Sequence, residues 1–160
     1  MRKIVVIRQY ATPLSLSGGH RIHRAFSLVS DLYSITTICS DFDHMSKRRH
    51  VSFSGLFYSE VENGIRTIFV KTLPYRKSLF VRIISLLGFN ILAIIALLIK
   101  VRKFDILVAS SAPINIPYSF LPLSRIYKSS FVYDVGDLWP DSISCIKPGI
   151  LYGVLKKVGD

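Results

Sequence analysis

The sequence predicts an α/β fold with a mostly parallel sheet, helices on both faces and one inserted β-hairpin. Three observations predict it. Short apolar runs alternate with segments in which apolar residues recur at helical spacing. An Asn-Gly pair lies between two β-prone runs, which is the strongest short-range signal of a hairpin. The chain has 160 residues, half of them hydrophobic, which suffices for one domain with a sizeable core.

The first half of the chain contains the predicted hairpin. Residues 4–7 form an apolar run typical of a strand buried on both faces. Helical spacing predicts a helix over 22–32, and 34–39 is predicted to be the second strand. The polar segment 40–50 is expected to be a mobile loop. Strands over 57–61 and 65–70 should pair through Asn63-Gly64.

The second half alternates between predicted helices and strands. A helix over 79–100 leads to a strand over 104–110, and a weaker helix pattern over 114–128 contains Pro117 and Pro122. A strand over 131–135 follows, and 149–157 has helical tendency. Right-handed crossovers would then align the strands in parallel. Ligands bind such sheets at the carboxyl ends of the strands, so the loops after residues 7, 109 and 135 are the candidate sites.

The positive charge is concentrated in the first two-thirds of the chain. Residues 1–104 carry 16 Lys/Arg and five Asp/Glu, whereas residues 105–160 carry five of each. Such asymmetry favours a polyanionic partner, either nucleic acid or an anionic membrane. Because two basic clusters, 75–77 and 100–103, flank the most apolar segment and no nucleic-acid reader motif is present, we expect a membrane surface and no nucleic acid.

The most apolar segment, residues 83–99, has 17 uncharged residues and would be about 25 Å long as a helix. Three interpretations are open: the segment is buried as a crossover helix, docks on lipid, or spans a bilayer. About 17 residues is the lower limit for a spanning helix. We rank spanning last, because it would separate the flanking strands. The buried and lipid-docking interpretations are compatible, since each uses one face. The residues expected near lipid headgroups are Arg76, Lys77, Arg82, Lys100, Arg102 and Lys103.

Two of the candidate loops carry residue types that suit a sugar or phosphate ligand. Gly18 and Gly19 precede the first helix, where glycines permit close backbone approach and the helix amides favour phosphate. A flexible turn is an equally good interpretation of a glycine pair. Ser110 and Ser111 suit a ligand, although at least one of them is expected to cap the following helix instead.

The third loop, after residue 135, carries three acidic or aromatic candidates. Asp137 either accepts hydrogen bonds from a substrate hydroxyl or caps a turn. Trp139 either offers a face for sugar stacking or packs in the core, which is the more common fate. Asp141 would share one side of a helical turn with Asp137. Asp134, within the preceding strand, is expected to pair with a basic group.

The sequence indicates neither a metal site nor a disulfide framework. His20 and His23 share a helix face but lack a third ligand, so we expect no metal and no other cofactor. Cys39 and Cys145 lack CxxC spacing, which fits a reducing cytoplasm. The apolar run near the N-terminus is too short for a signal peptide.

Taken together, four stretches resemble the N-terminal half of glycosyltransferase family 4, the retaining enzymes of GT-B fold. The branch that they resemble most builds bacterial O-antigen and capsule and is similar to the fucosamine transferases. In order the stretches are "SGGHRIHRAFSLVSDLYSITTICSDFDH", "VENGIRTIFVKTLPY", "FDILVASSAP" and "FVYDVGDLWPDSI". The last is the most specific, because "DLWP" followed by an acidic residue after a strand is typical of that branch. The resemblance implies a Rossmann-like, acceptor-side domain over residues 1–160.

The resemblance also implies an activity and a location. Such enzymes are peripheral proteins on the cytoplasmic side of the bacterial inner membrane. They move a sugar from a nucleotide sugar to a polyprenyl-diphosphate-linked glycan, with retention and usually without metal, during synthesis of lipopolysaccharide or capsule. The implied site residues are Gly18 and Gly19 for the donor phosphates, Asp137 for catalysis, and His20, Ser110, Ser111, Trp139 and Asp141 for the acceptor. Many relatives have His or Arg where this chain has Gly136.

The chain departs from the family in length. The family's second domain binds the nucleotide and carries two glutamates seven residues apart, with cations for the leaving diphosphate. Here the only glutamates, Glu60 and Glu62, lie in the hairpin. Without those cations the largest usual contribution to catalysis is missing. We therefore expect the chain alone to be an inactive half: a fragment, a truncated gene product, or a subunit whose partner supplies the C-terminal domain. The alternative is a membrane-attached, non-catalytic scaffold that recruits a nucleotide-binding partner.

Overall fold

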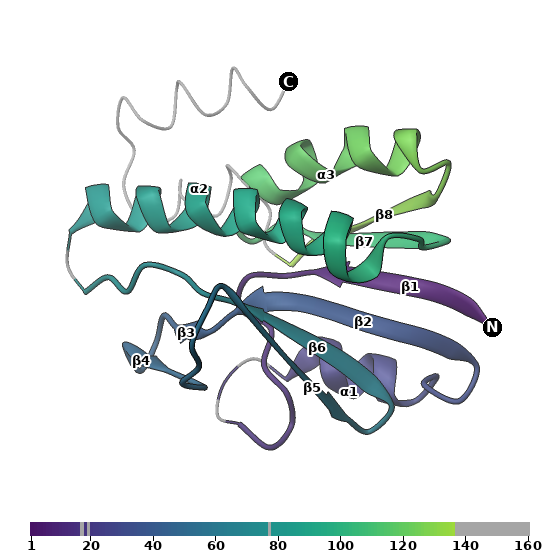
Figure 1. Ribbon diagram of the computed structural model, residues 1–160, viewed down its shortest axis with the longest axis horizontal. Helices are drawn as coiled ribbons and strands as arrows, with labels where there is room; N and C mark the ends of the chain where they lie inside the picture. Colours follow the sequence, from purple (N-terminus) through teal and green to yellow (C-terminus); the bar gives the residue numbers. More distant parts are fainter. Residues whose placement is uncertain (17, 19, 77, 137–160) are drawn as a thin grey trace.

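The fold is built on a six-stranded sheet in which five strands run parallel (Figure 1). The computed structural model describes residues 1–16, 18, 20–76 and 78–136. The strand order is β5-β6-β2-β1-β7-β8, with β5 antiparallel to β6 at one edge. The strands are β1 (Arg2–Ile7), β2 (Tyr33–Ser40), β5 (Phe57–Glu62), β6 (Ile65–Val70), β7 (Ile106–Ser110) and β8 (Ser130–Asp134). The mostly parallel α/β sheet with its hairpin is confirmed.

The order in which the strands are added to the sheet reverses beside β1. From β1 the chain moves outward through β2 to β6, and it then crosses back to β7 on the other side of β1. Val5 of β1 pairs with Leu107 of β7, which in turn pairs with Phe131 of β8. The carboxyl ends of β1, β7 and β8 are therefore neighbours, at the switch point where sheets of this kind bind ligands.

Helices cover both faces of the sheet (Figure 1). They are α1 (Arg21–Ser27) on one face, and α2 (Leu79–Ala96), the π-helix η1 (Leu97–Val101) and α3 (Asn115–Ile126) on the other. Alternate residues of β1 divide between the two cores. Ile4 and Val6 pack in the cluster beneath α1, whereas Val5 and Ile7 pack with Phe89 of α2. This division explains the unbroken apolar run in the sequence of β1.

The long helix α2 is a crossover helix with one buried face, as expected. The Ser78 hydroxyl caps it by accepting a hydrogen bond from the Val81 amide at 3.4 Å. Phe89, Ala93 and Ala96 recur at helical spacing and are fully buried in the core. The 23 residues Leu79–Val101 are long and apolar enough to cross a bilayer, but 33% of the most apolar stretch is buried inside the protein.

The first helix is shorter than the sequence predicts. It ends at Ser27 instead of continuing to residue 32. The hydroxyls of Ser27 and Ser30 each donate to a backbone carbonyl three residues earlier, a bond that offers the backbone an alternative to the helix. Leu28 and Leu32 are consequently 85% and 68% exposed, so part of the apolar spacing on which the longer helix depended does not reflect burial.

The segment 40–50, which was expected to be a mobile loop, includes regular structure. It contains two short antiparallel strands, β3 (Phe42–Asp43) and β4 (Arg48–Arg49). Asp41 is buried, pairs with Arg49 and accepts hydrogen bonds from the Thr72 amide at 2.8 Å and the Thr72 hydroxyl at 3.0 Å. Because a buried carboxylate needs such partners, this node anchors the segment to the loop after β6.

The remaining elements lie close to their predicted positions. Asn63 and Gly64 have φ angles of 49° and 74°, as a tight two-residue hairpin turn requires. The helix α3 is continuous: Pro117 lies in the first turn, where its missing amide is not needed, and Pro122 lies inside. The strand β7 begins at Ile106, two residues later than predicted. The helix predicted over 149–157 lies outside the described residues.

Candidate active site

A carboxylate at the end of β8 joins three elements at the switch point. Asp134 accepts hydrogen bonds from Arg8, which follows β1, and from Arg21, which begins α1. The Arg8 nitrogen lies 3.0 Å from the carboxylate, and one Arg21 nitrogen reaches both carboxylate oxygens, at 2.7 and 2.5 Å. Charge-assisted bonds of this kind are stronger than neutral ones. The predicted pairing of Asp134 with a basic group is confirmed, and we call these three residues the Asp134 centre.

The Asp134 centre has a net positive charge, because two guanidinium groups share one carboxylate. The side chains of Arg8 and Asp134 are 18% and 22% exposed, whereas that of Arg21 is 54% exposed. Arg21 therefore presents charge to solvent while Asp134 holds it in position. A positive centre at the carboxyl edge of the sheet favours an anionic ligand.

Ser110 ends β7 and Ser111 follows it; Ser111 connects the loops of the site, and neither serine caps α3. Ser110 and Ser111 are both buried. The Ser111 amide donates to the Asp134 carbonyl at 2.9 Å, and the Ser111 hydroxyl accepts from the Gly136 amide at 2.9 Å. The capping alternative is wrong, because the N-cap of α3 is Ile114 and no side chain caps that helix. A ligand would contact these serines only if the loops moved.

Gly18 lies in the loop between β1 and α1, where its backbone passes close to Thr12. Its φ angle is +137°, and a Cβ atom at this position would lie 2.6 Å from the Thr12 hydroxyl oxygen. Glycine is therefore required by the protein's own backbone geometry. The helix that follows has only seven residues, so its dipole contributes less than expected. Gly19 lies outside the described residues, and the role of the pair in phosphate binding stays a prediction.

An open groove of about 630 Å³ runs along α1 from Gly18. Its lining includes His20, Arg21 and Arg24, so two cations border it. His20 precedes the first residue of α1, and its Nδ1 atom is buried without a hydrogen-bond partner within the part of the chain that the structure describes. The groove has the size of a small-molecule site and shares Arg21 with the Asp134 centre. The predicted candidate His20 therefore does lie beside the switch point.

His23 has a structural position, although it lies three residues after His20. It is 1% exposed, and its Nε2 atom lies 3.0 Å from the Thr67 hydroxyl of β6. Burial lowers the pKa of His23, and the charge of Glu62 opposes that shift only in part. Across residues 1–16, 18, 20–76 and 78–136, no group of three or more His, Cys, Asp or Glu side chains is arranged to hold a metal ion.

Sequence reasoning did not find an aromatic cluster at the carboxyl edge. The Tyr10 and Tyr75 hydroxyl oxygens are 3.3 Å apart, and the rings of Tyr10 and His44 are centred 4.2 Å apart. Burial and, to a lesser degree, the hydrogen bond with Tyr75 raise the pKa of Tyr10 far above its ordinary value. The cluster joins the loops after β1, β3 and β6. No local motif marks it, because its members are far apart in the sequence.

The exit of β8 leads past Arg21 to the last described residue, Gly136. An added Cβ atom at Gly136 would lie 3.7 Å from an Arg21 nitrogen and 3.9 Å from the Ser111 hydroxyl, which are ordinary contacts. Asp137, Trp139 and Asp141 lie outside the described residues, and their roles stay predictions. No family model and no curated protein sequence matches the chain.

Proposed function

We propose that this chain is the acceptor-side half of a retaining glycosyltransferase. The complete enzyme would move a sugar from a nucleotide sugar to a polyprenyl-diphosphate-linked glycan during synthesis of a bacterial cell-surface polysaccharide. The observation that carries the proposal is the positively charged Asp134 centre, at the switch point of a mostly parallel sheet. A diphosphate-bearing ligand suits that charge, and the adjoining groove lined by Arg24 extends it.

The site residues have distinct roles in this proposal. Transfer forms a bond between the acceptor oxygen and the anomeric carbon, and it breaks the bond between that carbon and the donor diphosphate. The proton of the acceptor hydroxyl passes to the departing diphosphate. Asp137 orients the reacting hydroxyl groups, and Gly18 and Gly19 let the backbone approach the donor phosphates. In this proposal the acceptor is held by His20, Trp139 and Asp141, and it reaches the buried Ser110 and Ser111 only after the loops move. Asp134 keeps Arg21 in position beside them.

The chain alone should bind acceptor without transferring sugar. The departing diphosphate needs cations, and Asp134 already neutralises part of the charge of Arg8 and Arg21. The nucleotide-binding domain, in a longer chain or a partner subunit, supplies the rest in this proposal. The test is to incubate the purified chain with nucleotide sugars and vesicles that carry the lipid-linked acceptor. Robust turnover would refute the incomplete-half interpretation, and equal binding to vesicles without acceptor would refute the acceptor role.

Arg21 offers a sharper version of the same binding test. Arg21→Gln removes the exposed cation of the Asp134 centre and should weaken acceptor binding by about tenfold, the usual cost of one charge-assisted hydrogen bond. Arg125→Gln, which removes one exposed charge from α3, is the matched control and should change binding less than twofold. Equal losses in the two variants would indicate that the binding depends only on net charge.

We also propose that the outer face of α2 and η1 docks on an anionic membrane surface. Nine large apolar side chains are exposed along it: Leu79, Phe80, Ile83, Ile84, Leu87, Ile91, Ile95, Leu98 and Ile99. Exposed basic residues lie at both ends, namely Arg76, Lys100, Arg102 and Lys103, each contributing about 1 kcal/mol near anionic lipid. Arg82, also expected there, interacts with the Tyr10 hydroxyl. Lys77 lies outside the described residues.

A charge in the middle of this face tests the docking. Ile91→Asp should abolish most binding to anionic vesicles, because a carboxylate cannot enter the apolar layer cheaply. Ile126→Asp on α3, where the side chain is 73% exposed, is the control and should leave binding nearly unchanged. The same face also favours the alternative function, a membrane-attached scaffold. Specific binding of the lipid-linked acceptor to the chain argues for the transferase half, and its absence together with stable binding of a partner subunit argues for the scaffold.

A further inference from the structure

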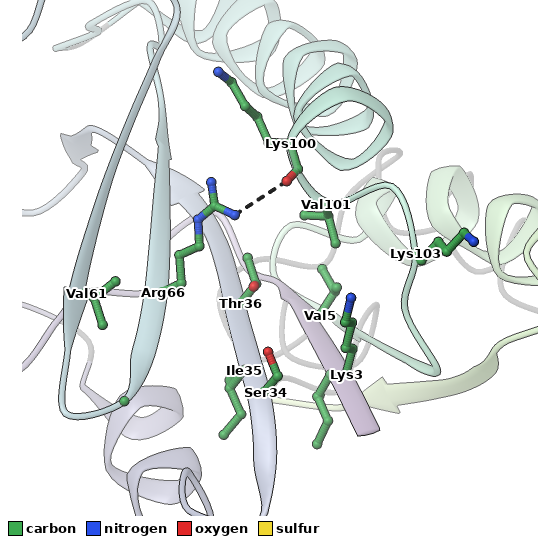
Figure 2. Close-up of a pocket in the computed structure, with 12 residues that line it drawn as sticks. Lys3, Val5, Ser34, Ile35, Thr36, Val61, Arg66, Lys100, Val101 and Lys103 are labelled. Carbon is green, nitrogen blue, oxygen red and sulfur yellow. Dashed lines mark hydrogen bonds between the residues drawn. The ribbon is translucent and has the colours of Figure 1, made fainter. Parts of the chain in front are cut away.

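A second pocket lies at the amino edge of the sheet, opposite the Asp134 centre. It has a volume of about 300 Å³ and opens between the end of η1 and the first residues of β1, β2 and β6 (Figure 2). Four basic residues, Lys3, Arg66, Lys100 and Lys103, line it together with the hydroxyl residues Ser34 and Thr36. The lining contains no acidic residue. The pocket was not anticipated from the sequence, because its residues come from four separate segments.

In the part of the chain that the structure describes, the cations of this pocket have no acidic ion-pair partner. The neighbouring acid, Asp105, accepts a hydrogen bond from the backbone amide of Lys3 at 2.7 Å and does not line the pocket. Lys100 lies in the last turn of η1 and Lys103 follows its end, where the helix dipole favours cations. The helix dipole does not explain the presence of Lys3 and Arg66, which lie in β1 and β6.

Arg66 is held in an orientation that serves the pocket. Its Nη1 atom donates to the Lys100 carbonyl at 3.4 Å, which leaves other N–H groups of the guanidinium available. In Figure 2 the head groups of Arg66 and Lys3 flank the opening, and the side chain of Thr36 lies between them in this view. The Lys100 and Lys103 ammonium groups point outward at the rim. A ligand between these strands would therefore contact Arg66 and Lys3, and the flexible side chains of Lys100 and Lys103 could turn onto it.

We propose that this pocket binds a phosphate group. Guanidinium, ammonium and hydroxyl donors match phosphate oxygens, and Arg binds them with a fixed fork of N–H groups. The exposed apolar residues Leu98 and Ile99 directly precede Lys100, which lines the pocket. That position suits the phosphate of a lipid whose acyl chains meet the apolar face of α2, and a soluble phosphate ester is the other source of the same chemistry. The proposal is independent of the transferase assignment, because it concerns the opposite edge of the sheet.

The first arm of the test uses inorganic phosphate, titrated into the chain and followed by NMR shifts of the amides around residues 34–36 and 64–66. Arg66→Gln should weaken binding by about tenfold, the usual size of one charge-assisted hydrogen bond. Arg48→Gln is the matched control, because Arg48 is also a strand arginine, in β4, but is exposed and does not line the pocket. It should change binding less than twofold. If the two variants weaken binding equally, or phosphate does not bind, the proposal is overturned.

The second arm distinguishes the two sources of phosphate. Vesicles of phosphatidylcholine with phosphatidic acid are compared with vesicles of equal charge that contain a carboxylate-bearing anionic detergent. A preference for phosphatidic acid that Arg66→Gln removes identifies a lipid phosphate. Phosphate binding that depends on Arg66 without this preference identifies a soluble phosphate ester. Lys3→Gln should reproduce the loss of phosphate binding, and thermal unfolding of each variant verifies that it is folded.

Discussion

The two edges of the sheet use charge in opposite ways. At the carboxyl edge, Asp41 pairs with Arg49, and Asp134 pairs with Arg8 and Arg21. At the amino edge, Lys3 and Arg66 share a pocket without an acid in its lining. Paired charges hold loops in one geometry. Charges of one sign that lie close together repel each other, and a bound anion would relieve that repulsion. The carboxyl edge is therefore organised by internal bonds, whereas the cations of the amino edge are available to an external ligand.

The largest expected effect on stability is the loss of the interactions that Asp41 makes with Arg49 and Thr72. Asp41→Ala should lower the free energy of unfolding by about 3 kcal/mol, because it leaves Arg49 and the Thr72 donors unpaired in a largely buried place. The value lies at the lower end for a buried pair, since the Arg49 side chain is 33% exposed and regains some hydration. Urea unfolding followed by circular dichroism measures it.

Asp105→Ala is the matched variant at the amino edge. Asp105 is exposed, and its carboxylate accepts one hydrogen bond from the Lys3 amide. Its loss should cost about 1 kcal/mol or less, because water replaces the carboxylate. Similar losses at Asp41 and Asp105 would show that the two edges do not differ in the way that we describe.

The next effect concerns the Asp134 centre. Asp134→Ala should cost about 1–2 kcal/mol, because Arg8 is only 18% exposed and loses an ionic partner, while Arg21 is freely hydrated. Arg8 keeps another interaction, which limits the loss. Urea unfolding measures the change. A loss as large as that of Asp41→Ala would mean that Asp134 also supports the core.

A smaller and more local effect is expected at Ser111. Ser111→Ala removes the hydroxyl that accepts the Gly136 amide at 2.9 Å, at a cost of about 1 kcal/mol. Hydrogen exchange of the Gly136 amide should then accelerate by about fivefold, while amides in the centre of β7 exchange unchanged. Unchanged exchange at Gly136 would contradict the role of Ser111 as a connector of the two loops.

The sequence predicts the sheet well because local signals determine it. The apolar run of β1 and the Asn63-Gly64 turn each specify an element without help from distant residues. The end of α1 was predicted too late, because hydrogen bonds of Ser27 and Ser30 compete with the helix and periodicity does not detect them. The segment after β2 was misjudged because Asp41 finds its partners at Arg49 and Thr72 only in the folded chain.

The candidate site was predicted only in part, because some of its contacts follow from the sheet and others form only in the folded chain. The pairing of β7 with β8 brings Ser111 and Asp134 together, and the predicted parallel sheet places the loops after these strands at one edge. The partners of Asp134 depend on which long side chains reach across β7, which no spacing rule encodes. Gly18 was noted for the approach of a ligand, yet the atom that it approaches is the hydroxyl of Thr12. The lining of the pocket at the amino edge comes from four segments, and its only sequence signal is the basic cluster at 100–103.

The smallest expected effect is also the most direct test of the amino edge. If Lys3 and Arg66 repel their neighbours in the ligand-free chain, Arg66→Gln should raise the free energy of unfolding by about 0.3 kcal/mol at low salt. The Debye length falls from about 10 Å at 0.1 M salt to about 3 Å at 1 M salt, so the gain in stability should vanish at high ionic strength. With saturating phosphate, Arg66→Gln should instead be less stable than the unmodified chain, because it binds the ligand more weakly. Arg48→Gln should show none of the three changes. A loss of 1 kcal/mol or more in Arg66→Gln at every ionic strength would mean that its bond to the Lys100 carbonyl is structural, and the amino edge would then resemble the carboxyl edge.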